Sequence, residues 1–236
     1  MNKHIEEDFS KMVANLLQSE FCKDFEPALL HGFMGIASEA GELLEKYLES
    51  IQYPGAIFTR TDTLIELSDL LHFMQMILGR LSLSITEVTQ ISVCHPSTYF
   101  YDKILLDQCT HFNSTLLRGF AGISSKSGEL LNRYKKFMFY HGESYTRSEI
   151  LEGLSKLFHY MQMIIDEYDS SIEEVMCINM AKLRTRYPEG YTHAKAITGN
   201  RDKEAEKANV EAAIDLFTTM RERKASGLGM DIDRDD

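Results

Sequence analysis

Two pairs of acidic residues in the first half of the chain have a spacing that suits metal binding. The members of each pair are three positions apart: Glu39 and Glu42, then Glu66 and Asp69. On a helix this spacing places both carboxylates of a pair on one face. If the two helices pack side by side, the four carboxylates come together. Any two of these negative charges that lie ~6 Å apart then repel each other by roughly 2–3 kcal/mol at an effective dielectric of about 20. Such a cluster needs a counter-charge, and oxygen ligands of high charge favour Mg²⁺, with Mn²⁺ as the alternative ion.

The elements that carry these acids belong to an internal repeat. Residues 31–93 align with residues 118–180 at an offset of 87 without a gap, and 28 of the 63 positions are identical. The clearest match is HGFMGIASEAGELLEKY against RGFAGISSKSGELLNRY. We interpret the chain as a tandem duplication.

Both halves are predicted to be helical, because apolar residues recur at spacings of three and four. In the first half we expect a second helix capped by Asp62 or Thr63, and a third capped by Ser84 with Glu87 three residues later. The helices expected in the first half cover 26–50, 62–81 and 86–94. Those expected in the second half cover 113–137, 148–168 and 172–185. Short helices at 4–19 and 98–112 and a last helix at 203–224, with Val210, Ala213, Phe217 and Met220 on one stripe, complete the prediction.

The composition agrees with an all-α fold. The 236 residues include only 4 prolines, and 44% of them are apolar against 26% charged. We therefore expect a tandem duplicated helical bundle, an intrachain pseudo-dimer. Its expected parts are a first repeat at 1–95, a degenerate repeat at 96–202, and a C-terminal helix with a flexible tail at 203–236.

The second half lacks most of the acidic pattern and therefore acts as a control. At the offset of 87, the four acids correspond to Lys126, Glu129, Gly153 and Lys156. The fold does not require the acidic quartet, because one copy is expected to fold without it. This favours a functional metal cluster in the first half, while the two lysines would neutralise the corresponding space around Glu129.

Charge and composition also limit the partners. The formal net charge of -11 disfavours nucleic acid as a partner. No stretch approaches the roughly 20 apolar residues of a membrane-spanning helix. The N-terminal sequence lacks the apolar run of a signal peptide and the four cysteines form no CxxC pair, so we expect a reducing cytoplasm.

At this point the residues resemble a known family. Glu39-x-x-Glu42, followed after 23 residues by Glu66-x-x-Asp69, is similar to the signature of the MazG-like branch of the all-α nucleoside triphosphate pyrophosphohydrolases. The second half adds a segment similar to one found in many such proteins, often from phages: Asn179-x-x-Lys182-Leu183-x-x-Arg186-Tyr187-Pro188. The sequence ITGNRD at 197–202 resembles their C-terminal ends. The resemblance covers roughly residues 26–202.

The resemblance implies an activity, a cofactor and a location. The reaction would convert a nucleoside triphosphate, with deoxynucleotides as the expected class, to the monophosphate and pyrophosphate. Mg²⁺ would be held by Glu39, Glu42, Glu66 and Asp69, and either Glu39 or Glu42 would be the catalytic base. The location would be the cytoplasm, that of the host if the protein is phage-encoded.

The chain departs from the single-repeat pattern of the family in a complementary way. Ser92 and His95 occupy the positions equivalent to Asn179 and Lys182, so the acids and the basic segment lie in different halves. We predict one composite site per chain, which resembles the tandem architecture of dimeric dUTPases in the same superfamily, and two chains could pair as a homodimer. The predicted substrate-binding residues are Lys46, Asn179, Lys182, Arg186 and Tyr187.

Other interpretations stay open at the level of sequence. The acids could lie on a solvated helix face, Lys46 could belong to an exposed network with Glu42 and Glu49, and Arg186 could simply complement a helix dipole. At the level of function, the chain could be a nucleotide-sequestering protein without turnover, or a scaffold that binds neither metal nor nucleotide. Asp69-x-x-His72 also resembles part of a di-iron carboxylate motif.

Overall fold

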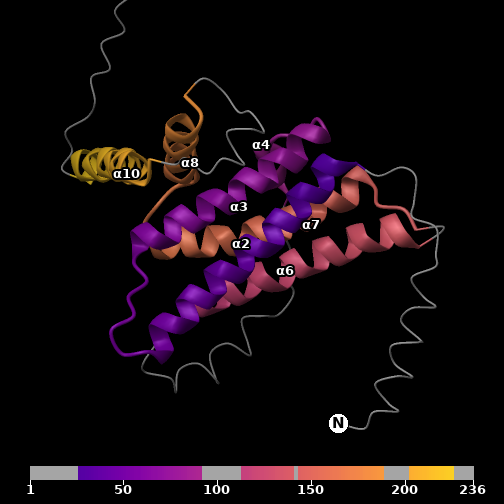
Figure 1. Ribbon diagram of the computed structural model, residues 1–236, viewed down its shortest axis with the longest axis horizontal. Helices are drawn as coiled ribbons and strands as arrows, with labels where there is room; N and C mark the ends of the chain where they lie inside the picture. Colours follow the sequence, from indigo (N-terminus) through magenta and orange to yellow (C-terminus); the bar gives the residue numbers. More distant parts are fainter. Residues whose placement is uncertain (1–25, 92–112, 141–142, 189–201, 226–236) are drawn as a thin grey trace, which may run out of the picture.

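All regular secondary structure in the described part of the protein is α-helical. The computed structural model describes residues 26–91, 113–140, 143–188 and 202–225, and no strand occurs in these ranges (Figure 1). The predicted all-α class is therefore confirmed. The predicted helices at 4–19 and 98–112, the boundary at 95–96 and the tail after 225 lie outside the described residues.

The described residues of the first half, 26–91, form three helices, α2 (Pro27–Gln52), α3 (Arg60–Arg80) and α4 (Ile85–Gln90). The predicted cap of α3 is wrong: Thr59 is the N-cap, and Asp62 is the third helical residue. The Thr59 hydroxyl accepts a hydrogen bond from the Asp62 amide, and the Asp62 carboxylate accepts one from the Thr59 amide at 2.9 Å. The predicted capping box of Ser84 and Glu87 is present, although α4 ends at Gln90 instead of near residue 94.

The second half repeats these helices at the offset of 87. They are α6 (Ser114–Phe139), α7 (Arg147–Glu167) and α8 (Ile172–Arg186), and each begins 87 residues after its counterpart. The helix α8 is longer than α4, with 15 residues against 6. This extension carries the predicted basic segment Asn179 to Arg186.

The two halves contact each other in reciprocal pairs. The third helix of each half packs on the second helix of the other half, α8 on α3 and α4 on α7. The Tyr47 hydroxyl donates to the Asn113 carbonyl at 3.0 Å, and the equivalent Tyr134 hydroxyl donates to the Glu26 carbonyl at 3.1 Å. These contacts are reciprocal, while the interpretation as an intrachain pseudo-dimer stays a prediction.

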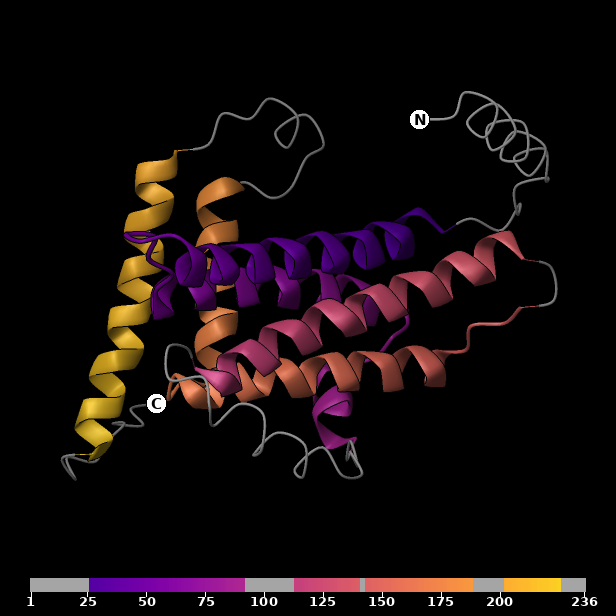
Figure 2. The same cartoon turned by 90° about the horizontal axis from the view of Figure 1, so that it is seen from below.

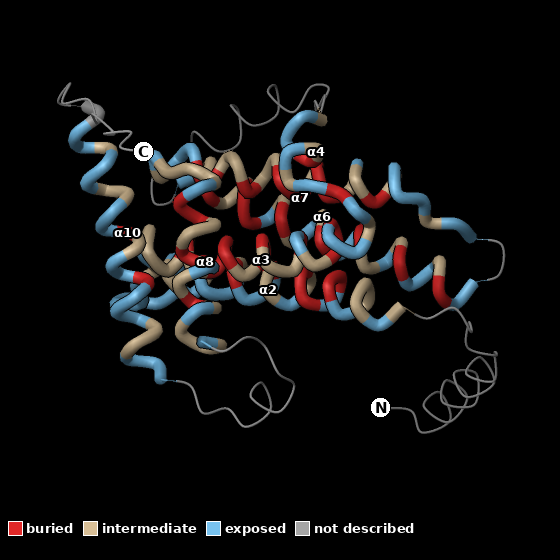
Figure 3. Tube along the Cα trace, turned by 90° about the horizontal axis from the view of Figure 1, so that it is seen from above, coloured by how far each residue is buried: buried red, intermediate tan, exposed pale blue. Residues whose placement is uncertain are grey.

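A shared core fills the space between the halves. Buried residues lie along the facing sides of the long helices (Figure 3). The ring of Phe33 packs on Tyr134 with centroids 4.7 Å apart, and Tyr47 packs on Phe120 at 4.4 Å. The core therefore fixes the position of α2 relative to α6 as well as to α3.

Helices α2 and α3 approach each other closely near the acidic residues. A Cβ atom built on Gly35 would lie 2.2 Å from the Phe73 ring, which is closer than a real side chain allows. Gly35 is one helical turn before Glu39, so this close approach brings the acid-bearing face of α2 near α3.

The last helix, α10 (Lys203–Ala225), packs against α8, where Figure 2 shows the two helices side by side. Val210 and Ile214 are the buried apolar residues of this contact, whereas Met220 of the predicted stripe is 37% exposed. The predicted apolar stripe is therefore correct at Val210 and wrong at Met220, because the buried face of α10 includes Ile214 and does not extend to Met220. None of the described helices is long and apolar enough to cross a membrane.

Candidate functional site

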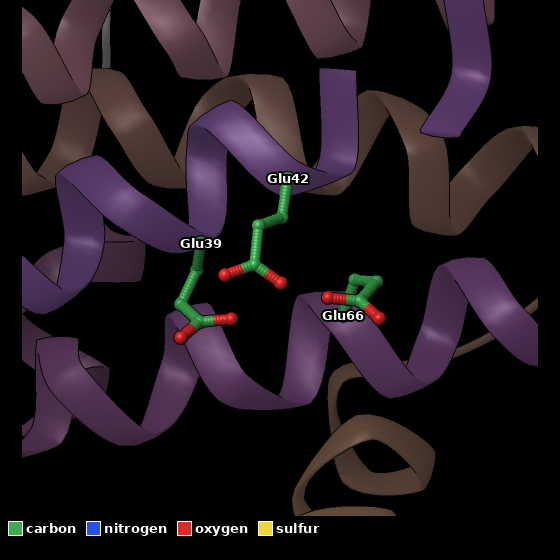
Figure 4. A group of neighbouring side chains, drawn as sticks. All are labelled: Glu39, Glu42 and Glu66. Carbon is green, nitrogen blue, oxygen red and sulfur yellow. The ribbon is translucent and has the colours of Figure 1, made fainter. Parts of the chain in front are cut away.

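Three of the predicted metal ligands converge between α2 and α3. Glu39 and Glu42 project from α2 toward Glu66 on α3 (Figure 4). Each offers a carboxylate oxygen, and these oxygens lie within 4.8 Å of one another. Glu66 is only 8% exposed, Glu39 is half-buried and Glu42 is exposed, so the trio lies at the edge of the core.

The proximity of the acids changes the titration of Glu39. Burial, the largest cause, and the neighbouring charges of Asp69, Glu42 and Glu66 together raise the pKa of Glu39 to about 7, although the charge of Lys182 lowers it. A carboxyl among other carboxylates ionises more easily when a positive charge lies between them. A hard divalent cation bound by oxygen ligands supplies that charge, so the donor set fits Mg²⁺ or Mn²⁺.

The fourth predicted ligand, Asp69, has a different partner. Its Oδ2 atom lies 2.5 Å from Nζ of Lys182 on α8, and the Lys182 side chain is only 4% exposed. On the same helix Asn179 donates through Nδ2 to the Ser68 carbonyl at 2.9 Å. The predicted set of four acids therefore divides into a trio of glutamates and an aspartate that is paired with a buried lysine.

These side chains line one cavity of about 950 Å³, a size typical of small-molecule sites. Its wall joins α2 and α3 of the first half with α8 of the second. The predicted residues on this wall are Glu39, Glu42, Glu66, Asp69, Asn179, Lys182, Arg186 and Tyr187. The structure thus brings the acidic and the basic segments together, as the composite-site prediction requires.

Comparison with known proteins adds no identity. No family model, curated protein or solved structure matches this chain. The chemistry of the cavity therefore has to be inferred from its own side chains.

Lys46 is the predicted site residue that the cavity does not include. Its Nζ lies 2.6 Å from Oε1 of Glu66, and the side chain lines a separate pocket of about 230 Å³. Burial alone would lower the pKa of Lys46, but its hydrogen bond to Glu66 and the nearby acids raise it. Lys46 thus compensates the buried Glu66, in place of the exposed pairs with Glu42 and Glu49 that the spacing suggested.

Sequence reasoning missed the apolar and aromatic part of the wall. His31, Phe73 and Met76 line the cavity, and Phe73 stacks edge-on with His31 at a centroid distance of 5.5 Å. The signal was present, because His31 lies eight residues before Glu39 and Met76 seven after Asp69, so each shares a helix face with an acid. His72 also lines the cavity, and burial lowers its pKa. Among the described residues, the group able to hold a metal contains three carboxylates and no histidine, which disfavours the di-iron alternative.

The equivalent region of the second half is small and internally neutralised. The Nζ atom of Lys126 lies 2.7 Å from Glu129, and this hydrogen bond lowers the Glu129 pKa, with further help from Lys156. The pocket there measures about 150 Å³. At the position equivalent to Glu66, a Cβ atom on Gly153 would lie 2.6 Å from Leu130. The expected neutralisation of this region is therefore present.

The raised pKa of Glu39 predicts a pH dependence of stability in the metal-free protein. Its value of about 7 in the folded state exceeds the ordinary value of 4.5, so between these values the folded state binds more protons. The contribution of Glu39 to stability is therefore fully present below about pH 4.5 and is lost as the pH rises through about 7. Urea unfolding in EDTA should show Glu39→Gln gaining stability relative to the wild type from pH 5 to pH 8. A constant difference across this range would contradict the prediction.

Proposed function

We propose that this chain is a Mg²⁺-dependent nucleoside triphosphate pyrophosphohydrolase of the MazG-like kind, with deoxynucleoside triphosphates as the expected substrates. One observation carries the proposal: a trio of glutamates lies in the same cavity as Lys182, Asn179 and Arg186. The glutamates can hold a divalent cation, and the side chains of Lys182, Asn179 and Arg186 can donate hydrogen bonds to phosphate oxygens. The cavity wall therefore matches both components of a metal–triphosphate complex.

Glu39, Glu42 and Glu66 would hold the metal ion, with Asp69 near them. The bound ion would neutralise charge on the phosphates and lower the pKa of water. Lys182 and Asn179 belong to α8, which packs on α3, so their distance from the acids is set by the core and not by a loop. This rigidity favours accurate positioning of the phosphates.

The reaction needs one proton acceptor from the chain. Water attacks the α-phosphorus, the bond from that phosphorus to the α–β bridging oxygen breaks, and pyrophosphate leaves with that oxygen. A carboxylate accepts a proton from the attacking water. Both Glu39 and Glu42 face the cavity from α2, so either could take this role.

A panel of dNTPs and NTPs, incubated with Mg²⁺ and analysed for all products, tests the proposal. We expect monophosphate and pyrophosphate, no reaction in EDTA, and no reaction with Glu39→Gln. Release of orthophosphate, or turnover that persists in EDTA, would contradict the proposed reaction.

A nucleotide-sequestering protein on the same fold is the second candidate. The ion pair of Lys182 with Asp69 favours it, because it engages an acid that an enzyme of the family would use for metal. Tight Mg²⁺-dependent nucleotide binding without turnover, measured by calorimetry with the same panel, would support this second function over hydrolysis.

A cytoplasmic location and pairing of two chains into a homodimer belong to the same proposal. Light scattering of the purified chain at several concentrations gives its mass in solution and therefore tests the homodimer directly. A mass of 27.1 kDa at all concentrations would exclude the homodimer.

A further inference from the structure

A paired arginine joins the cavity to the C-terminal helix. Arg186, at the last helical position of α8, donates from Nε to Oε2 of Glu206 at 2.7 Å and from Nη2 to Oε1 at 2.5 Å. Both side chains are largely buried, with exposed fractions of 18% and 16%. A two-bond fork of this kind fixes the plane of the guanidinium as well as its position.

The same arginine is also part of the cavity wall. Arg186 lines the cavity of about 950 Å³ that contains the glutamate trio. The hydrogen bond to Glu206 and, to a smaller extent, the charge of Asp69 raise the Arg186 pKa, so the guanidinium stays charged at the cavity wall. The guanidinium has five N–H donors and the fork to Glu206 uses two, so three donors are not engaged by this pair and donate no further hydrogen bond among the described residues.

The helix α10 does not need this fork as its only attachment to the bundle. Val210 and Ile214 are buried at 3% and 8% exposure. Arg221 donates to Glu174 at 3.0 Å, and Asn209 donates to the Thr185 hydroxyl at 2.9 Å. The docking of α10 therefore does not depend on Glu206 alone.

We propose that Glu206 is a positioning residue, which holds the Arg186 guanidinium at the cavity so that its other N–H groups bind the phosphates of a polyphosphate ligand. The ligand class rests on the proposed function. Removing the rotamer freedom of a long side chain before the ligand arrives reduces the entropic cost of binding. The C-terminal helix, which lies beyond both repeats, is then part of the binding site.

The test separates this role from simple docking of α10. Calorimetry measures the affinity for inorganic tripolyphosphate with Mg²⁺, and thermal unfolding is followed for the same full-length proteins. Glu206→Gln should weaken the affinity roughly three- to tenfold, whereas the control Glu211→Gln should leave it unchanged. Glu211 lies on the same helix, pairs with Lys207 at 3.8 Å and is not among the residues that line the cavity. Because the pair of Glu206 is more buried, Glu206→Gln should also lower the melting temperature more than the control does.

A charge-swapped variant, Arg186→Glu with Glu206→Arg, completes the experiment. It restores the ion pair with its members exchanged, so the melting temperature should return toward the wild-type value. The affinity for tripolyphosphate should stay at least about tenfold weaker, since a carboxylate now occupies the cavity side. Wild-type affinity in the swapped variant or in Glu206→Gln would overturn the positioning role, and so would absence of tripolyphosphate binding by the wild type. If the wild type binds tripolyphosphate but does not hydrolyse nucleotides, the proposed hydrolysis is rejected and the positioning role of Glu206 is not.

Discussion

Replacing Glu42 by glutamine is expected to lower kcat/KM for the proposed Mg²⁺-dependent nucleotide hydrolysis by about 10³-fold. Glu42 is one of the three carboxylates whose oxygens lie within 4.8 Å of one another. Loss of one charged metal ligand removes several kcal/mol of transition-state stabilisation, and ~4 kcal/mol corresponds to this factor. Metal affinity should fall in parallel, because a neutral amide is a weaker ligand for a hard cation.

The chain offers a matched control for this prediction. Glu129 occupies the position equivalent to Glu42 in the second half, where it is paired with Lys126 at 2.7 Å beside a small pocket. Glu129→Gln should therefore leave kcat/KM and Mn²⁺ binding unchanged. Steady-state kinetics and calorimetric Mn²⁺ titration of both variants provide the readouts. Equal losses in the two variants would show that the carboxylate acts through the fold and not through a metal site.

The spacing of the acids predicted a cluster of four carboxylates if the two helices pack side by side, and the structure groups the three glutamates of this set. Positions three apart on two helices of one repeat must share faces, and the close approach at Gly35 brings these faces together. The partners of the other charged residues were not predictable in this way. The pair of Lys182 with Asp69 forms because α8 of one half crosses α3 of the other, and the pair of Arg186 with Glu206 depends on how α10 docks. Spacing along one helix contains no information about such crossings.

The wrong cap of α3 has a different cause. Asp62, Thr63 and Thr59 are all residue types that cap helices, so type alone did not decide between them. The structure selects Thr59 because Asp62 then returns a hydrogen bond to the cap amide. The repeat contained this signal, since Thr146 and Glu149 form the equivalent capping box at the start of α7. Comparing the two halves for the Thr-x-x-acid pattern would have found it.

The largest effect on stability is expected at Glu174, which is 1% exposed and joins three helices. Arg60 on α3 donates to both of its carboxylate oxygens at 2.9 and 2.8 Å, Arg221 on α10 donates at 3.0 Å, and the Ser170 hydroxyl donates at 2.7 Å. Removing one partner of a buried ion pair leaves uncompensated charge. Glu174→Ala should therefore lower the free energy of unfolding by about 3–5 kcal/mol, measured by urea unfolding.

The equivalent residue of the first half shows why burial decides the size of this effect. Glu87 closes the capping box of α4, but it is 44% exposed and its ion pair with Arg147 spans 3.8 Å. Glu87→Ala should cost only ~1 kcal/mol, the usual value of a lost cap contact. Because Glu174 ties both α3 and α10 to α8, its loss should also weaken tripolyphosphate binding by the folded variant, at urea concentrations too low to unfold it. Equal destabilisation by the two alanine variants would contradict the view that this buried carboxylate holds the acid-bearing helix α3 and the C-terminal helix α10 against α8.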